Sequence, residues 1–209
     1  MGQASPDVSS RPPLVCLVVF AVVWCALAIA PRFREDWLLE NALTLIAVPA
    51  LVWSRRRFRF SDRSYIQITI FLILHTIGSH YTYSEVPIGD WARDAFGLAR
   101  NHYDRVVHFS FGFLMLRPVR EVGFWRGRPG RFAELTFCVA AVALWSVAYE
   151  AIEWIVAAIV DPAAGTAYLG TQGDEWDAQK DMTLAVGGAI LAAMLERRLD
   201  RWRHDRALE

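Results

Sequence analysis

Residues 133–160 read AELTFCVAAVALWSVAYEAIEWIVAAIV, an apolar stretch of 28 residues. A transmembrane helix needs about 20 residues to cross the hydrocarbon core of a bilayer, so this stretch is long enough to span a membrane. The whole chain has the same character, because 55% of its 209 residues are hydrophobic and only 21% are charged. This composition excludes disordered, collagen-like and disulfide-scaffold proteins. The net charge of zero argues against nucleic acid as a partner.

Five more apolar stretches accompany the first. The chain is therefore predicted to be an all-α, six-helix transmembrane bundle that forms a single integral-membrane domain over residues 1–209. The fourth and sixth spans contain uncharged runs of only eleven and fourteen residues, 106–116 and 182–195. These two helices cross only if charged residues are drawn to membrane depth. The six predicted spans are roughly 14–30, 37–53, 65–83, 103–119, 133–160 and 178–195.

The first span also has features of a cleavable signal sequence. Arg11 precedes it, and the small residues Ala28 and Ala30 lie at its end. Its 17 apolar residues exceed the usual hydrophobic region of a signal sequence, and Pro31 would directly follow the cut. An uncut transmembrane helix is the favoured interpretation.

Basic residues are distributed unevenly between the two sides of the predicted bundle. With six spans, 16 of the 22 basic residues fall on the side that carries both termini, and 14 of the 22 acidic residues fall on the other. Loops rich in arginine stay in the cytoplasm and contact anionic lipid headgroups. Both termini are therefore predicted to be cytoplasmic, with an acidic outer face.

Ionisable residues at the outer ends of four spans are the candidate functional residues. At a rise of 1.5 Å per residue, the last four spans bring their acids and histidines to one layer of the membrane. A carboxylate near a helix centre costs about 2.5–3.5 kcal/mol, so such groups usually face a bundle interior or a water-filled cavity. The residues expected to line one cavity open to the periplasm are His80, Asp104, His108, Glu150, Glu153, Asp177 and Asp181.

The donor set of this layer favours a divalent metal as a cofactor. Carboxylate oxygens and neutral imidazole suit Mg²⁺, Mn²⁺ or Zn²⁺. The spacing Asp174-x-x-Asp177-x-x-x-Asp181 aligns three carboxylates on one helix face. These three residues and Glu153 are the predicted metal ligands.

Other polar residues are predicted to act on a substrate. His108 or Glu150 would serve as general base, and Arg105 would stabilise the charge that develops on a phosphate. The loop before the sixth span contains several glycines, whose backbone N–H groups are suited to holding an anion ahead of a helix. The predicted binding residues are His75, His80, Tyr83, Asp104, Gly170 and Gly173.

Three sequence motifs carry a family resemblance. The first is His75-x4-His80-Tyr81-x-Tyr83, and the second is Asn101-His102-Tyr103-Asp104-Arg105-x-x-His108-Phe109. The third is Gly170-Thr171-Gln172-Gly173-Asp174-x-Trp176-Asp177-x-Gln179-x-Asp181-Met182. Over about residues 35–195 the chain resembles the YjdF-type family of uncharacterised bacterial inner-membrane proteins. The resemblance implies a multi-pass protein of the bacterial inner (plasma) membrane, and it implies no established activity.

A more distant likeness connects the chain to VanZ-like membrane proteins. It rests on the helix start Asp104-Arg105-x-x-His108-Phe109, on the later Glu150 and Glu153, and on Asp181 ahead of Gly187-Gly188. This likeness, too, implies a membrane fold without a settled activity.

Three functions are compatible with these features. The first is a metal-dependent hydrolase or transferase that acts on a lipid-linked or phosphorylated substrate. The second is a small proton- or ion-coupled transporter, although the inner halves of the last three spans are nearly apolar and no inverted repeat is visible. The third is a non-catalytic membrane scaffold, in which the polar layer is a structural ion-pair cluster. The lipid bilayer is the expected partner in each case, and no feature indicates an oligomeric state.

Overall fold

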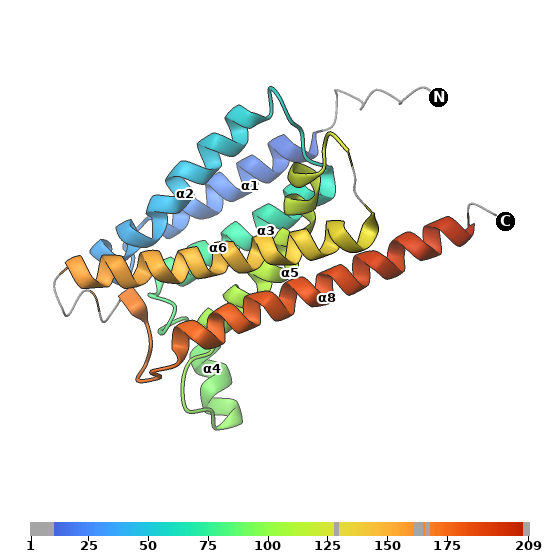
Figure 1. The fold of residues 1–209 in the computed structure, drawn as a ribbon. Helices are drawn as coiled ribbons and strands as arrows, with labels where there is room; N and C mark the ends of the chain where they lie inside the picture. Colours follow the sequence, from blue (N-terminus) through green and yellow to red (C-terminus); the bar gives the residue numbers. More distant parts are fainter. Residues whose placement is uncertain (1–10, 128–129, 161–164, 166–167, 207–209) are drawn as a thin grey trace.

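The computed structural model describes residues 11–127, 130–160, 165 and 168–206. Within these ranges the chain is helical and contains no strand, so the all-α prediction is confirmed. Seven helices are described there, one more than the six predicted spans (Figure 1). They are α1 (Pro12–Leu27), α2 (Arg34–Ser54), α3 (Asp62–His80), α4 (Pro87–Phe96), α5 (Tyr103–Gly123), α6 (Arg131–Ile159) and α8 (Asp177–Arg206).

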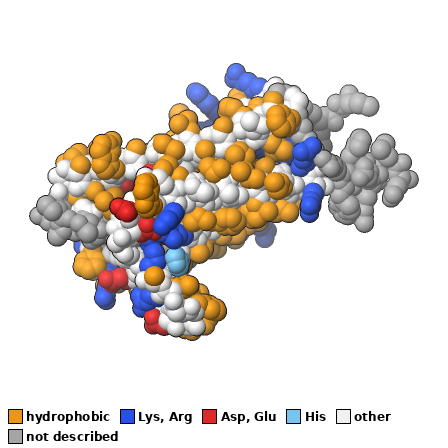
Figure 2. Space-filling view, turned by 60° about the horizontal axis from the view of Figure 1, so that its bottom comes forward, with side chains coloured by type: hydrophobic (Ala, Val, Ile, Leu, Met, Phe, Trp, Pro, Cys, Tyr) orange, Lys and Arg blue, Asp and Glu red, His pale blue; other side chains and the backbone are white. Residues whose placement is uncertain are grey.

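Two of these helices are long and apolar enough to cross a membrane. They are α2 and the segment Phe132–Ile159 of α6. Helix α1 is apolar but has only 16 residues. The flanks of the molecule expose large apolar side chains such as Ile46, Leu144 and Trp145, and Figure 2 shows apolar side chains along much of its body. Contact with lipid accounts for this exposure.

Helix α4 corresponds to none of the predicted spans. It begins at Pro87, whose missing N–H suits the first turn of a helix, and it ends before Gly97, which takes a left-handed φ of 63°. Its ten residues are too few to cross a bilayer, which is why hydropathy does not reveal it. Figure 1 shows α4 projecting from one side of the bundle, and it exposes Trp91 and Phe96.

Helix α5 lies at the centre of the fold. It contacts α3, α6 and α8, while α1 and α2 pack against α3 and α6 packs against α8. The closest approach is between α5 and α8, where a Cβ atom on Gly112 would collide with the carbonyl of Ala185. A Cβ atom on Gly188 would likewise collide with the carbonyl of Phe109. Small residues allow this backbone contact, which brings the first turns of α5 and α8 together.

Charged residues form two layers along α5, α6 and α8, with an apolar layer between them. The apolar layer includes Leu116, Val142 and Ala189, all fully buried. The two charged layers contain Asp181 and Glu196 of α8, which are 15 residues apart, or about 22 Å at the rise of a helix. This separation approaches the thickness of the hydrocarbon core of a bilayer, about 30 Å.

The layer around Glu196 is a set of ion pairs, which we call the Arg120 network (Arg117, Arg120, Glu121, Glu134 and Glu196). Arg120 Nε lies 2.7 Å from Glu134 Oε1, and its Nη1 lies 3.2 Å from Glu196 Oε2. Arg117 Nη2 lies 2.6 Å from Glu196 Oε1. Each carboxylate therefore has a guanidinium partner, and the network joins α5, α6 and α8 at this end of the bundle.

Candidate functional site

A cavity of about 40 Å³ lies among α2, α5, α6, α8 and the loop before α8. A space of this size holds a cation or a few water molecules, and it is too small for a whole lipid. The cavity is lined by the carboxylates of Glu40, Asp104, Glu150, Glu153, Asp177 and Asp181, and by Tyr83, His108, Tyr168, Leu169, Gly170, Thr171 and Ala178.

Three of these residues converge closely enough to hold one metal ion. Asp104, His108 and Asp181 each offer a ligand atom, and these atoms lie within 4.8 Å of one another. Asp104 and His108 share a face of α5 because they are four residues apart, and Asp181 faces them from α8. His108 Nε2 lies 3.4 Å from Asp104 Oδ1 and 3.6 Å from Glu150 Oε1.

Two carboxylate oxygens of residues that line the cavity accept no hydrogen bond from the described residues. They are Asp181 Oδ1 and Glu150 Oε1, and both are buried. Asp181 is only 2% exposed. Glu150 Oε1 has His108 Nε2 at 3.6 Å. Burial of an ionised carboxylate without a partner costs several kcal/mol, so the position beside Asp181 Oδ1 is suited to a cation or a proton.

The deep wall of the cavity is a hydrogen-bonded set on α2, α3 and α6. Tyr149 Oη donates to Glu40 Oε2 at 3.0 Å. His75 Nε2 lies 3.1 Å from the carbonyl oxygen of Glu40, and His75 Nδ1 lies 2.5 Å from Tyr83 Oη. If Nε2 donates to the carbonyl, Nδ1 accepts from the tyrosine hydroxyl, which fixes His75 in one neutral tautomer. His75 therefore supports the wall from behind and does not line the cavity.

Asp174 and Asp177, two of the predicted metal ligands, are engaged in ion pairs. Arg105 Nη2 lies 2.5 Å from Asp174 Oδ2 and 3.3 Å from Asp177 Oδ1. Arg100 forms a buried ion pair with Asp177. Lys180 Nζ lies 2.6 Å from Asp174 Oδ2, and this contact holds the pKa of Asp174 at about 2, below its usual value of 3.8. Three cations thus neutralise these two carboxylates.

The glycine-rich loop before α8 is held by the same segment of chain. The side chain of Gln172 accepts a hydrogen bond from the N–H of Asn101 at 3.0 Å and donates one to its carbonyl at 3.0 Å. Arg100 donates to the carbonyl of Thr171 at 3.1 Å. Gly170 and Gly173 take left-handed φ values of 58° and 85°, which glycine adopts without steric cost. Arg100 and Asn101 therefore clamp the loop against the start of α5.

The structure brings together many of the residues that the sequence singles out. Those that line the cavity are Tyr83, Asp104, His108, Glu150, Glu153, Gly170, Asp177 and Asp181. The predicted residues that do not line it are His75, His80, Arg105, Gly173 and Asp174. His80 was expected there, but its Nδ1 lies 2.7 Å from the carbonyl oxygen of Leu27, so its ring faces α1 and joins α3 to that helix.

The sequence does not predict four residues of the site, namely Glu40, Arg100, Tyr149 and Tyr168. Glu40 carried a usable signal, because an acid within a predicted span usually marks a polar interior. Arg100 carried no such signal, since it lies in a loop 77 residues before its partner Asp177.

Comparison with known proteins places the chain in a family. Residues 12–201 match DUF2238, described as a predicted membrane protein. Inner membrane protein YjdF of Escherichia coli (strain K12) is 36% identical over 166 residues, which are 78% of each chain. No solved structure is detectably similar, and the likeness to VanZ-like proteins receives no support. The similarity to YjdF confirms the family resemblance that the three motifs indicate. The chain therefore belongs to the DUF2238 family of predicted membrane proteins.

Proposed function

We propose that this protein binds a divalent cation through Asp104, His108 and Asp181 and uses it for hydrolysis or transfer on a lipid-linked or phosphorylated substrate. One observation carries the proposal. The three ligand atoms lie within 4.8 Å of one another, and the buried Asp181 Oδ1 receives no hydrogen bond from the described part of the chain. The donor set, two carboxylates and an imidazole, suits Mg²⁺, Mn²⁺ or Zn²⁺.

The charge balance favours a bound cation over a purely structural cluster. Arg100, Arg105 and Lys180 are engaged by Asp174 and Asp177, which leaves one positive charge in excess beside the cavity but not among the residues that line it. Among the described residues that line the cavity, His108 is then the basic group left to face five carboxylates, namely Glu40, Asp104, Glu150, Glu153 and Asp181. The Arg120 network shows the contrasting case, in which two arginines pair with the acids around them.

The roles of the residues follow from their positions. A divalent cation at this place would polarise a phosphoryl group and activate a bound water. Because His108 belongs to the ligand set, the role of general base passes to Glu150, whose Oε1 is buried and free of hydrogen bonds from the described residues. The small cavity volume admits the reacting group of a substrate, while a lipid chain would remain outside in the bilayer.

A metal titration tests the proposal. Added Mg²⁺, Mn²⁺ or Zn²⁺ is expected to stabilise the purified protein by about 2.7 kcal/mol at a hundredfold excess over Kd, because the cation binds the folded state. Thermal unfolding in detergent measures the effect. The Asp181→Asn variant is expected to lose the response, because it loses an anionic ligand.

Asp174→Asn is the matched control for this titration. It removes the same charge from a neighbouring position, yet Asp174 is bound to Arg105 and Lys180, so the metal response should persist. A protein that contains no metal after purification and shows no stabilisation by any of the three cations would refute the proposal. It would leave the scaffold as the better interpretation.

We further propose that six helices of this protein cross the inner membrane, with both termini in the cytoplasm. The uneven distribution of arginine supports this orientation. The relative from E. coli is an inner membrane protein by name, and the two charged layers lie about 22 Å apart along α8. Reporter fusions after Arg59 and Arg126 should report the cytoplasm, and a fusion near Gly170 should report the periplasm. A cytoplasmic signal near Gly170 would place the cavity on the wrong side for an outer-leaflet substrate.

A further inference from the structure

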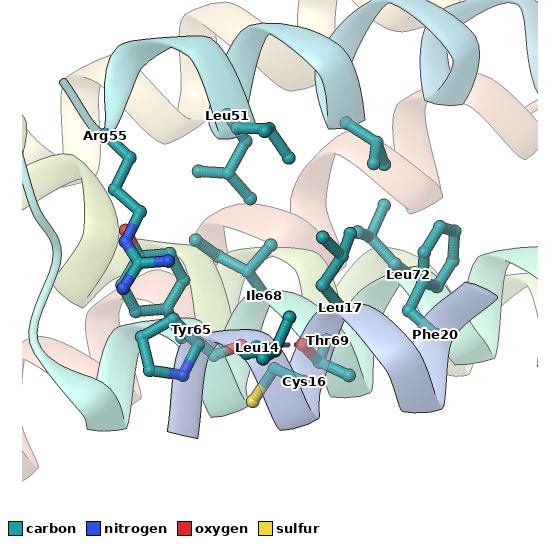
Figure 3. Close-up of a pocket in the computed structure, with 13 residues that line it drawn as sticks. Leu14, Cys16, Leu17, Phe20, Leu51, Arg55, Tyr65, Ile68, Thr69 and Leu72 are labelled. Carbon is teal, nitrogen blue, oxygen red and sulfur yellow. Dashed lines mark hydrogen bonds between the residues drawn. The ribbon is translucent and has the colours of Figure 1, made fainter. Parts of the chain in front are cut away.

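An apolar groove of about 80 Å³ lies between α1, α2 and α3, at the end of the bundle opposite the carboxylate cavity. Leu14 and Leu17 of α1, Leu51 of α2, and Ile68 and Leu72 of α3 line its walls (Figure 3). A membrane protein exposes such a groove to acyl chains, which are as apolar as these side chains.

The groove has a structural cause. At the far end of these helices, a polar contact ties α1 to α2, because Trp24 Nε1 donates to Asn41 Oδ1 at 2.7 Å. Asn41 Nδ2 in turn donates to Ser79 Oγ of α3 at 3.2 Å. Figure 1 shows α1 and α2 diverging away from this tie. The groove opens where they diverge, beside the start of α1 and the end of α2.

The charged group that lines this groove lies at one end. Arg55 extends from the end of α2 beside Tyr65 in Figure 3, and both residues line the groove. Tyr65 is 6% exposed, and its hydroxyl has no hydrogen-bond partner among the described residues. A guanidinium at the mouth of an apolar groove, with a buried tyrosine hydroxyl beside it, complements a phosphate attached to a hydrocarbon chain.

We propose that the groove binds an anionic phospholipid, with a few methylene groups of one acyl chain seated between α1, α2 and α3 and the phosphate at Arg55, beside Tyr65. Arg55 is the charged residue that lines the groove, and its charge favours a headgroup of net negative charge over a zwitterionic one. This site is independent of the proposed metal centre. Failure of one proposal therefore leaves the other standing.

Native mass spectrometry of the detergent-solubilised chain tests the headgroup. The protein is mixed with equal amounts of phosphatidylglycerol and phosphatidylcholine that carry the same acyl chains. Wild-type protein is expected to retain about five times more phosphatidylglycerol, which corresponds to about 1 kcal/mol for one arginine. Arg55→Ala should bring the ratio close to one. Arg56→Ala is the matched control, because Arg56 is exposed and does not line the groove, and it should leave most of the preference intact.

A second pair of variants tests the acyl chain. Leu17→Trp is expected to fill the groove and to lower the retention of both lipids, whereas Val18→Trp places the same side chain on the exposed face of α1 and should not. Equal retention of the two lipids by the wild-type protein would overturn the proposal. The proposal would also be overturned if Arg55→Ala and Arg56→Ala lost the preference for phosphatidylglycerol equally. Neither of these surface variants requires the helices to repack. Loss of retention in Val18→Trp as large as in Leu17→Trp would also overturn it.

Discussion

Replacing Gly188 with leucine is expected to separate α5 from α8 and to dismantle the carboxylate cavity. A Cβ atom at this position collides with the backbone of Phe109 and Phe113, and neither backbone can rotate out of the way as a side chain can. Overpacking of this kind costs about 1–3 kcal/mol, and contact with backbone on the facing helix puts the cost at the upper end. Thermal unfolding in detergent should show the loss, and the metal response that depends on Asp181 should disappear with it.

Gly187→Leu provides a closely matched control. A Cβ atom on Gly187 meets nothing within 4 Å, and the change in helix propensity is the same at both positions. Replacement of glycine within a helix should stabilise the protein by up to about 1 kcal/mol where no collision occurs. If Gly188→Leu is as stable as Gly187→Leu and still responds to metal, the close approach of α5 and α8 does not position the cavity.

Replacing Arg100 with methionine is expected to destabilise the protein by less than the cost of a wholly unpaired buried charge, about 3–5 kcal/mol, because Arg105 Nη2 remains 3.3 Å from Asp177 Oδ1. Arg100 is 7% exposed and pairs with Asp177. Its loss also leaves the carbonyl of Thr171 without that donor, so the loop before α8 should become more accessible. Unfolding measurements combined with limited proteolysis of this loop test both expectations.

Arg93→Met is the control for Arg100→Met. Arg93 lies on α4 with a side chain 37% exposed and pairs with Asp90 and Asp94, and exposed pairs are worth at most about 1 kcal/mol. The double variant Arg100→Met/Asp177→Leu should lose less stability than the sum of the two single losses, because the two residues interact directly. Additive losses would show that Arg100 acts through something other than Asp177.

The convergence of the cavity residues could be predicted because it depends on helix geometry alone. Asp104 and His108 are four residues apart and Glu150 and Glu153 are three apart, so each pair shares a face. The apolar runs fix the depth of each helix in the membrane, and acids at that depth face inward. These rules are sufficient to bring α5, α6 and α8 to one polar layer.

Other parts of the site depend on contacts that periodicity does not encode. The sequence places Asp174, Asp177 and Asp181 on one face, but Arg100 from a distant loop engages Asp177 while Asp181 lies deeper, beside His108. The rotation of α3 about its axis turns His80 toward α1, and hydropathy does not determine that rotation. Helix α4 was detectable in principle from Pro87 and Gly97, yet it is too short to register as a span.

The apolar layer between the cavity and the Arg120 network has a bioenergetic consequence. Leu116, Val142 and Ala189 are each fully buried and provide no hydrogen-bonding side chain. These three side chains therefore offer no group that could pass a proton or cation from the cavity toward the Arg120 network. With the proposed orientation, the reaction proposed for the cavity would take up and release protons on one side of the membrane without draining the proton-motive force.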